Sequence, residues 1–309
     1  MLREFLTYVT YPKKIKKAPH GEHNNLVIDK YKISINDVSP INGSIVEYNN
    51  DYLFIFRINE KKDKTYLGIC LLDEKFKQKT PYKVIDSNTS TAEDPRIFKN
   101  GSSYFIVYND KLSIKHFCRA MFIAKLDENF NIEYKTCLDL HIKAVEKNWV
   151  PFVDNNKILL SYNPMPHKVM HLKDPKINNL LHLCYENNPC FSRFFWDYGT
   201  PRGGTPAILI DDMYLSFFHS SFGKSDPKWY VMGAYLYDSK EPYKVKKVSK
   251  HPIIFGKRKS IFSVFPCGIA IRKKNKKNQI IISYGENDII TNALVIDKDK
   301  LYSQMKDVY

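Results

Sequence analysis

The chain has 309 residues, with 21 Tyr and 19 Phe against 12 Gly, and a formal net charge of +15 at pH 7. A chain of this length buries a sizeable core, as one large domain or as two smaller ones, and its aromatic and β-branched residues favour strands. The first residues lack the apolar run of a signal peptide, and no later run is long enough to span a bilayer. We therefore expect a cytoplasmic protein without a membrane span.

The six Cys residues show no C-x-x-C spacing, and most of them lie in apolar, strand-like runs. This pattern favours reduced Cys residues in a core over a zinc site or a set of disulfides. No clear set of metal ligands has a usable spacing, so no metal and no other bound cofactor is predicted.

The positive charge fits three kinds of partner: nucleic acid, an anionic membrane surface, or an acidic or phosphorylated ligand. The lysines gather in turns, at 13–17, 61–64 and 273–277, where solvated hairpin tips explain them. No recognition-helix pattern or aromatic motif typical of nucleic-acid binding is present, so no nucleic-acid partner is predicted. The oligomeric state is left open.

Residues 1–38 are basic and mixed in character, and we expect them to form a lead-in segment that packs on a single domain at 39–309. In this domain one unit recurs about every fifty residues. It consists of a short strand, a polar turn, an aromatic-rich strand, a loop, and a third strand that in most copies ends at an Asp. The aromatic-rich strands lie at 52–57, 104–109, 158–163, 214–219 and 280–285.

No helical period separates these strands, which excludes a βαβ fold. The repeat predicts an all-β fold, a five-bladed β-propeller, which closes on itself and leaves only short edges. Closure brings the starts of the five innermost strands to one end of the central channel, and the second strands return to that end. The polar side chains expected there are Asn42, Arg57, Glu93, Asp94, Arg96, Asn109, Asp110, Lys147, Asn148, Asn163, Arg202, His219, Glu286 and Asp288. Convergent polar groups in a concave pocket indicate a ligand site.

Two of these residues, Glu93 and Asp94, are adjacent carboxylates that precede Pro95 and Arg96 at the start of a predicted strand. Proline fixes its own φ and pushes the residue before it toward an extended conformation. We expect Asp94 to be extended and to be held on a stiff segment at the mouth of the channel. Taken alone, the same stretch also fits a surface turn with a local ion pair.

A set of short segments, taken together, resembles glycoside hydrolase family 130, whose members are five-bladed propellers that phosphorolyse or hydrolyse β-mannosides. The segments span most of the domain and lie at 42–44, 57, 93–96, 147–148, 204–206, 218–219, 230, 233–235, 264–268 and 284–288.

The resemblance implies that Asp94 is the general acid of an inverting reaction and that its proton reaches the leaving oxygen through a sugar hydroxyl. It also implies a mannosyl-binding group, formed by Asn42, Arg57 and Asp288. The residues that it places near the nucleophile or the acceptor are Lys147, Asn148, His219 and Tyr230.

One position departs from the family pattern. Phosphorylases of the family carry an arginine on the second strand of the third blade, where this chain has Asn163; Arg202 and His167 are candidate replacement cations. Three reactions on an oligosaccharide or glycoside stay open: hydrolysis with Glu286 as base, mannosyl transfer from a sugar nucleotide, and phosphorolysis with inorganic phosphate held by a rebuilt anion site. A glycan-binding propeller without catalysis and a basic interaction scaffold are the alternatives outside enzymes.

Overall fold

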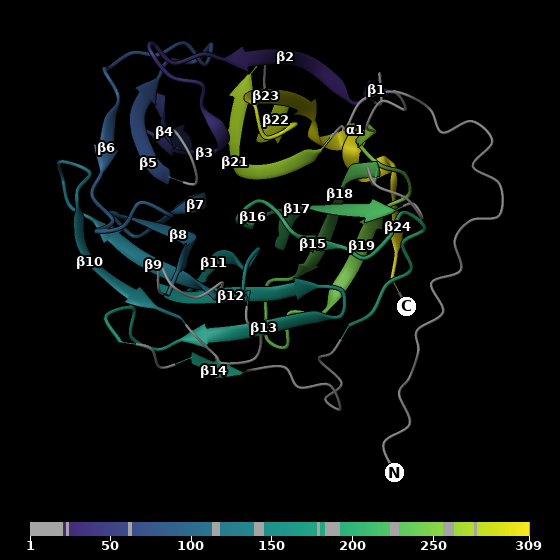
Figure 1. Cartoon of the computed structure of the whole chain (residues 1–309). Helices are drawn as coiled ribbons and strands as arrows, with labels where there is room; N and C mark the ends of the chain where they lie inside the picture. Colours follow the sequence, from purple (N-terminus) through teal and green to yellow (C-terminus); the bar gives the residue numbers. More distant parts are fainter. Residues whose placement is uncertain are drawn as a thin grey trace.

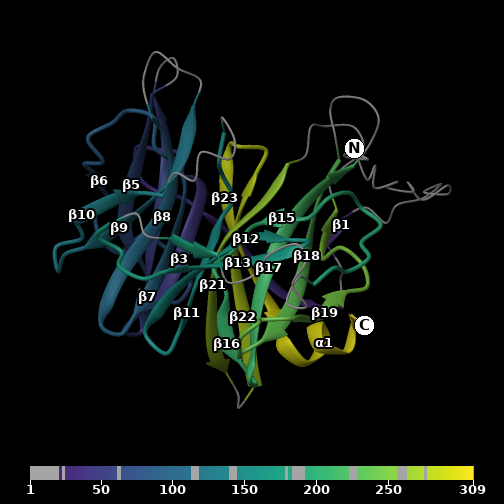
Figure 2. The ribbon, with the colours of Figure 1, turned by 90° about the horizontal axis from the view of Figure 1, so that it is seen from below.

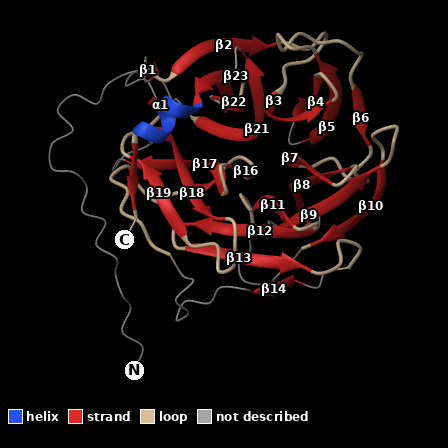
Figure 3. Ribbon diagram, turned by 180° about the vertical axis from the view of Figure 1, so that it is seen from behind, coloured by secondary structure: helices blue, strands red, loops and turns tan. Residues whose placement is uncertain are grey.

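Five sheets stand around a central axis in the computed structural model, and each sheet is one blade of a propeller (Figure 1). The structure describes residues 21–22, 25–60, 64–112, 118–138, 145–177, 180–182, 192–222, 229–255, 263–274 and 277–308. The predicted five-bladed β-propeller is confirmed. Strands dominate the described residues, and a single short helix accompanies them there (Figure 3).

Each blade has an innermost strand followed by antiparallel neighbours. The first blade contains β3 (Ile41–Tyr48), β4 (Asp51–Glu60), β5 (Lys64–Leu72) and β6 (Lys83–Ile85). The second contains β7 (Glu93–Asn100), β8 (Ser103–Lys111), β9 (Arg119–Leu126) and β10 (Ile132–Cys137). The third contains β11 (Val150–Asp154), β12 (Lys157–Pro164), β13 (His167–Leu172) and β14 (Leu180–His182).

The fourth blade has an interrupted inner edge, because β15 and β16 both pair with β17. Its strands are β15 (Arg202–Gly203), β16 (Ile208–Ile210), β17 (Met213–Phe222), β18 (Trp229–Asp238), β19 (Val245–Ser249) and β20 (Ile254–Phe255), joined by β1 (Gly21–Glu22) and β24 (Met305–Asp307). The fifth blade contains β21 (Val264–Lys274), β22 (Lys277–Glu286), β23 (Ile290–Asp297) and β2 (Val27–Ile33).

The middle of the second strand of each blade is mostly apolar and buried, because neighbouring blades cover both of its faces. In β4, for example, Tyr52 to Arg57 are buried without alternation. The hairpin that follows each innermost strand is tight, and φ is positive at Asn49 (54°) and at Asp211 and Asp212 (47° and 63°). Asn and Asp tolerate this left-handed conformation, which is why they mark the turns in the sequence.

The hydrophobic core lies between the blades. Leu53 and Ile55 of the first blade pack with Ile97 and Tyr108 of the second, and comparable buried clusters lie between the other neighbouring blades. Each sheet is therefore held by its neighbours, and the positions of the innermost strands around the axis are fixed by these interfaces.

The ring closes through the N-terminal side of the chain. Strand β2 pairs with β23 as the outermost strand of the fifth blade, so a purple strand lies beside a yellow one in Figure 1. Residues 27–33 belong to the segment that we expect to be a lead-in, whereas residues 1–20 lie outside the described part of the chain.

The C-terminal segment connects the fourth and fifth blades. Helix α1 (Lys298–Ser303) begins at Asp297, whose side chain accepts a hydrogen bond from the Lys300 amide, and it contacts β22 and β23. Strand β24 then pairs with β19, and Figure 2 shows α1 at this side of the ring. In the described part of the chain, no helix has the length and apolar character needed to cross a membrane.

Candidate functional site

Two of the innermost strands, β3 and β7, begin with a β-bulge. The pairing of β3 with β4 shifts between Ile41 and Ser44, and the pairing of β7 with β8 shifts between Glu93 and Arg96. Bulges of this kind re-aim a side chain at the end of a strand. Asn42 and Asp94, which lie within the two shifts, have φ values of 48° and 52°. The expectation that Asp94 is extended is therefore wrong, because the bulge overrides the bias that the following proline imposes.

Asn42 and Arg57 of the first blade join two aspartates from different blades. Nδ2 of Asn42 lies 2.9 Å from Oδ1 of Asp94 and 2.8 Å from Oδ1 of Asp288. The Arg57 guanidinium lies 3.2 Å from the same oxygen of Asp94 and 3.4 Å from that of Asp288. All four residues were predicted to share one end of the channel. Among the described residues no hydrogen bond to Oδ2 of Asp94 is found, and the Asp94 side chain is 13% exposed. We call the end of the channel where these four residues meet the well.

Arg96 is buried next to this group, with 1% of its surface exposed, and it braces the backbone there through hydrogen bonds. It donates to the backbone oxygens of Asp94 (3.0 Å) and Gly204 (2.5 Å), and it lies 3.5 Å from Oδ1 of Asn148. Its guanidinium also lies over the Phe265 ring, 5.2 Å from the centroid. Burial lowers the pKa of Arg96. The side chain thus ties the second, third and fourth blades together rather than reaching into the well.

Glu93 turns to the other side of the strand from Asp94. Its carboxylate lies 3.2 Å from the Arg119 guanidinium, which also donates to Oδ1 of Asn109 (2.5 Å) and to the Thr91 carbonyl oxygen (2.6 Å). Burial, followed by the charge of Asp94, raises the pKa of Glu93. Arg119 was absent from the sequence-based candidates, because its pairing with Lys111 across β8 and β9 is evident only in the structure.

A cationic group surrounds His219 on the fourth blade. His219 is 3% exposed, pairs with Arg202 across β15 and β17, and has ring neighbours in Phe265 (4.8 Å) and Tyr230 (6.4 Å). Burial, together with the positive charges of Arg96, Arg202 and Lys147, lowers its pKa to about 3. The imidazole is therefore neutral, and the fixed charges around it are positive.

Four other candidates have no described contact with the Asp94 group; they are Glu286, Asp110, His167 and Asn163. Glu286 accepts from Asn292 (3.1 Å) and lies 3.8 Å from Lys30, both in the outer half of the fifth blade. Asp110 accepts from the hydroxyl groups of Thr89 and Thr91, at 2.5 Å each.

His167 lies between the third and fourth blades, where Nδ1 is 2.9 Å from the Tyr243 carbonyl oxygen and the ring contacts Tyr237. Burial lowers its pKa to about 4. Asn163 pairs with Lys168 beside a shift in the β12–β13 register. The structure thus brings neither residue into the described contacts of the Asp94 group.

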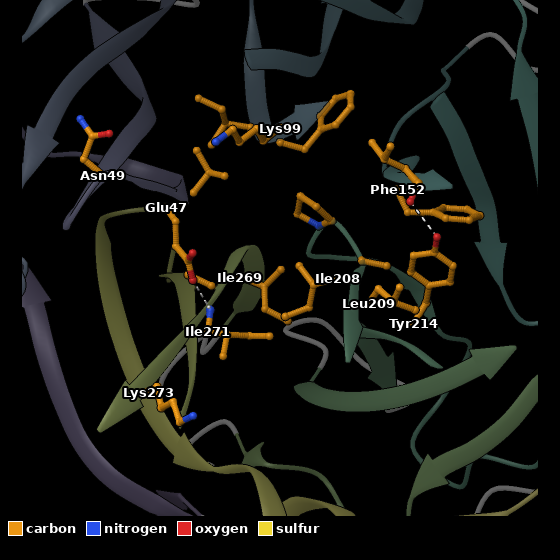
Figure 4. Close-up of a pocket in the computed structure, with 17 residues that line it drawn as sticks. Glu47, Asn49, Lys99, Phe152, Ile208, Leu209, Tyr214, Ile269, Ile271 and Lys273 are labelled. Carbon is orange, nitrogen blue, oxygen red and sulfur yellow. Dashed lines mark hydrogen bonds between the residues drawn. The ribbon is translucent and has the colours of Figure 1, made fainter. Parts of the chain in front are cut away.

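A separate apolar cavity of about 680 Å³ occupies the opposite end of the channel (Figure 4). It is lined by the far halves of the innermost strands, including Glu47, Lys99, Phe152 and Ile269. The Glu47 carboxylate accepts from the Ile271 amide at 3.0 Å. Asp94 and Asp288 and the cations around His219 lie at the other end of the channel, so this cavity is not the candidate active site. Among the described residues no three His, Cys, Asp or Glu side chains form a group that could hold a metal ion.

Comparison with known proteins supports the same fold and identifies a family. The model of glycoside hydrolase family 130, described as beta-1,4-mannooligosaccharide phosphorylase, matches residues 80–307. A 1,2-beta-oligomannan phosphorylase from a Thermoanaerobacter species is 24% identical over 238 residues, which are 70% of this chain and 69% of that protein.

Two solved structures share the fold at low identity. A protein of Parabacteroides distasonis assigned as a glycoside hydrolase has a TM-score of 0.65 at 15% identity, over 91% of this chain and 96% of its own. MPT-4, a mannose phosphorylase from Leishmania mexicana in complex with a phosphate ion, has a TM-score of 0.61 at 12% identity, over 93% of each chain. The chain therefore belongs to glycoside hydrolase family 130 and is an enzyme of the glycoside phosphorylase type.

Proposed function

We propose that the protein is an inverting phosphorylase of β-mannosides, with Asp94 as the general acid. The observation that carries the proposal is that an acidic group and a cationic group lie at the same end of the channel. The acidic group is the pair of carboxylates of Asp94 and Asp288, which Asn42 and Arg57 hold. The cationic group lies around the neutral His219. An acid and an anion-binding group on different sides of a sugar are what inverting phosphorolysis requires.

In the proposed reaction, a phosphate oxygen attacks C1 of the mannosyl ring while the bond from C1 to the leaving oxygen breaks. Asp94 supplies the proton that the leaving oxygen takes up, through a sugar hydroxyl. The products are α-mannose 1-phosphate and the shortened glycoside, and Asp94 recovers its proton from the incoming phosphate or from water. Asn42, Arg57 and Asp288 hold the mannosyl ring by hydrogen bonds to its hydroxyl groups.

The phosphate is proposed to lie near Lys147, Asn148, Arg202, His219 and Tyr230. Arg202 is exposed on β15, directly opposite His219. It therefore supplies the positive charge that other phosphorylases of the family carry on an arginine at the position of Asn163. A neutral imidazole can donate or accept one hydrogen bond without adding charge, whereas Lys147 and Arg202 attract the anion.

Hydrolysis is less well supported. It needs a carboxylate base that activates water on the face opposite the acid. Glu286 is held by Asn292 and Lys30, and the charged groups that shift the pKa of His219 are all cations.

The test is incubation of the full chain with β-1,2-mannobiose or β-1,4-mannobiose, with and without inorganic phosphate, and separately with GDP-mannose and mannose. Formation of mannose 1-phosphate only when phosphate is present supports the proposal. Free mannose at equal rates with and without phosphate would show hydrolysis, and elongation only from GDP-mannose would show transfer. Binding of mannobiose without any turnover would show a glycan-binding propeller.

A further inference from the structure

A second cavity lies beside Asp94, between the first and second blades, with a volume of about 480 Å³. This volume is within the range of small-molecule sites. The charged residues that line it are Arg57, Glu60, Lys64, Glu93, Lys111, Arg119 and Lys147.

Three segments that are distant in sequence build this cavity. They are the ends of β4 and β5, the ends of β8 and β9, and the segment 145–147 that leads into the third blade. Backbone hydrogen bonds of 2.9 Å join them, from the Thr65 amide to the Ser90 oxygen and from the Glu146 amide to the Arg119 oxygen. The cavity therefore lies between segments that backbone hydrogen bonds hold together, and it is not a gap at one hairpin tip.

The charges around the cavity do not cancel. Five cationic residues and two carboxylates line it. Arg57 is balanced by Asp94 and Asp288, and Arg119 is balanced by Glu93. Lys64 lies opposite Glu60 in the β4–β5 pairing, which offsets part of its charge. Lys64, Lys111 and Lys147 form no ion pair with a carboxylate in the described part of the chain. Like charges held this close repel one another, and a bound anion relieves that repulsion.

The cavity adjoins the Asp94 group through Arg57, which lines it and contacts Asp94. A general acid must lie beside the leaving oxygen, so the sugar that carries this oxygen extends along the face of Asp94. The phosphate that attacks C1 must come from the opposite face, where we place Arg202 and His219. Lys147 lines the cavity and its charge also acts on His219, so it lies between the two sites.

We propose that this cavity binds a phosphate or carboxylate group carried by the sugar on the leaving-group side, so that the enzyme prefers anionic glycans as substrates and anionic sugars as acceptors. The inference rests on the proposed phosphorylase function. In the synthetic direction, the bond from C1 of α-mannose 1-phosphate to the phosphate oxygen breaks and C1 bonds to the acceptor oxygen. The acceptor hydroxyl loses its proton to Asp94, and inorganic phosphate leaves.

The experiment compares mannose, mannose 6-phosphate and mannuronic acid as acceptors for α-mannose 1-phosphate, with the full chain. We expect kcat/KM for at least one anionic acceptor to exceed that for mannose about tenfold at low salt. This preference should shrink as the ionic strength is raised to about 0.5 M, where exposed charges are screened. The two anionic acceptors distinguish a phosphate group from a carboxylate.

The double variant Lys64→Gln, Lys111→Gln should remove this preference and leave kcat/KM for mannose within about twofold, because neither lysine reaches the Asp94 group. The control is Lys273→Gln, Lys274→Gln, which removes the same charge from the opposite end of the propeller. Equal use of neutral and anionic acceptors by the wild type would overturn the proposal. A raised KM for inorganic phosphate in the double variant would also overturn it, because the cavity would then hold the nucleophile.

If no acceptor is mannosylated, the phosphorylase proposal fails, and calorimetric titration of mannose 6-phosphate and mannuronic acid still tests the cavity. Binding of either that the double variant loses and the control retains supports the anion site. No binding of either to the wild type contradicts it.

Discussion

Asn42 and Asp94 are 52 residues apart in the sequence, yet the amide of Asn42 donates a 2.9 Å hydrogen bond to the carboxylate of Asp94. Both residues have left-handed φ angles and both lie in a bulge at the start of an innermost strand. Such a conformation costs of order 1–3 kcal/mol for each residue and persists only where the surroundings fix it. Here the acid of one blade is oriented by the amide of its neighbour.

Replacement of Gly285 by Ala should disturb the hydrogen bond between Asn42 and Asp94 without changing Asp94 itself. A Cβ at residue 285 would lie 1.8 Å from Oδ1 of Asn42, so Asn42 must move. A displacement of about 1 Å in a group that positions an acid costs about 100-fold in rate, and we expect kcat/KM to fall by that order. Steady-state kinetics with mannobiose and phosphate measure the effect. Gly101→Ala is the control for loss of a glycine, because a Cβ there meets no atom within 4 Å, and the positive φ of Gly101 (59°) makes it the more strained backbone position of the two. Equal losses of kcat/KM in the two variants would contradict the role of Asn42.

Arg96→Lys should destabilise the fold as well as the site. An ammonium cannot replace a guanidinium that donates to Asp94, Gly204 and Asn148 from a buried position. We expect the free energy of unfolding to fall by about 3 kcal/mol, as for other broken buried charge interactions. Urea denaturation measures this change. The same substitution at the more exposed Arg272 should cost less than about 1 kcal/mol; an equal cost at both positions would contradict the bracing role of Arg96.

His167 should make the stability of the protein depend on pH in the mildly acidic range. The pKa of His167 is about 4 in the folded protein and has the ordinary histidine value of 6.5 in the unfolded chain, so the unfolded chain binds one more proton between these two pH values. The contribution of His167 is complete above pH 6.5 and is lost as the pH falls toward 4. Thermal unfolding of the wild type and of His167→Gln, measured from pH 8 to 4, should show a shallower acid decline in the variant. Parallel declines would mean that His167 does not titrate as its burial requires.

Arg202→Gln should raise the KM for inorganic phosphate about tenfold, since one charge contact to the anion is lost. The KM for mannobiose should change little, because Arg202 is on the fourth blade and the sugar is held by residues of the first, second and fifth. Initial rates at varied phosphate and fixed mannobiose, and the reverse, separate the two constants. A higher KM for mannobiose with an unchanged KM for phosphate would place Arg202 on the sugar instead.

The aromatic-rich second strands could be predicted because they are buried on both faces and therefore appear as apolar runs between polar turns. The outermost strands could not. In β2, only Ile33 is fully buried, and Asp29, Lys30 and Lys32 are exposed, so its sequence resembles a loop. Its strand character comes from pairing with β23, which is distant in the sequence.

The candidate site was predictable where it lies in strand ends next to the axis, as for Asp94, Arg57 and Asp288. It was not predictable where a bulge or a long-range contact decides the direction of a side chain. Glu286 and Asp288 are two residues apart, yet the first turns to Asn292 and the second to Asn42. Arg119 contacts Glu93 only because the β8–β9 hairpin places it there, and its sequence neighbours carry no sign of this ion pair.

The most direct test of the account is the rate of mannose 1-phosphate formation by Asp94→Asn. Asparagine keeps an oxygen that accepts from Asn42 and Arg57, so the fold and the binding of mannobiose should be retained while proton transfer is lost. We predict a fall in kcat of about 1,000-fold, within the range for general acids, with an unchanged thermal unfolding midpoint. A variant that forms mannose 1-phosphate at the wild-type rate would contradict the assignment of Asp94 and, with it, the proposed mechanism.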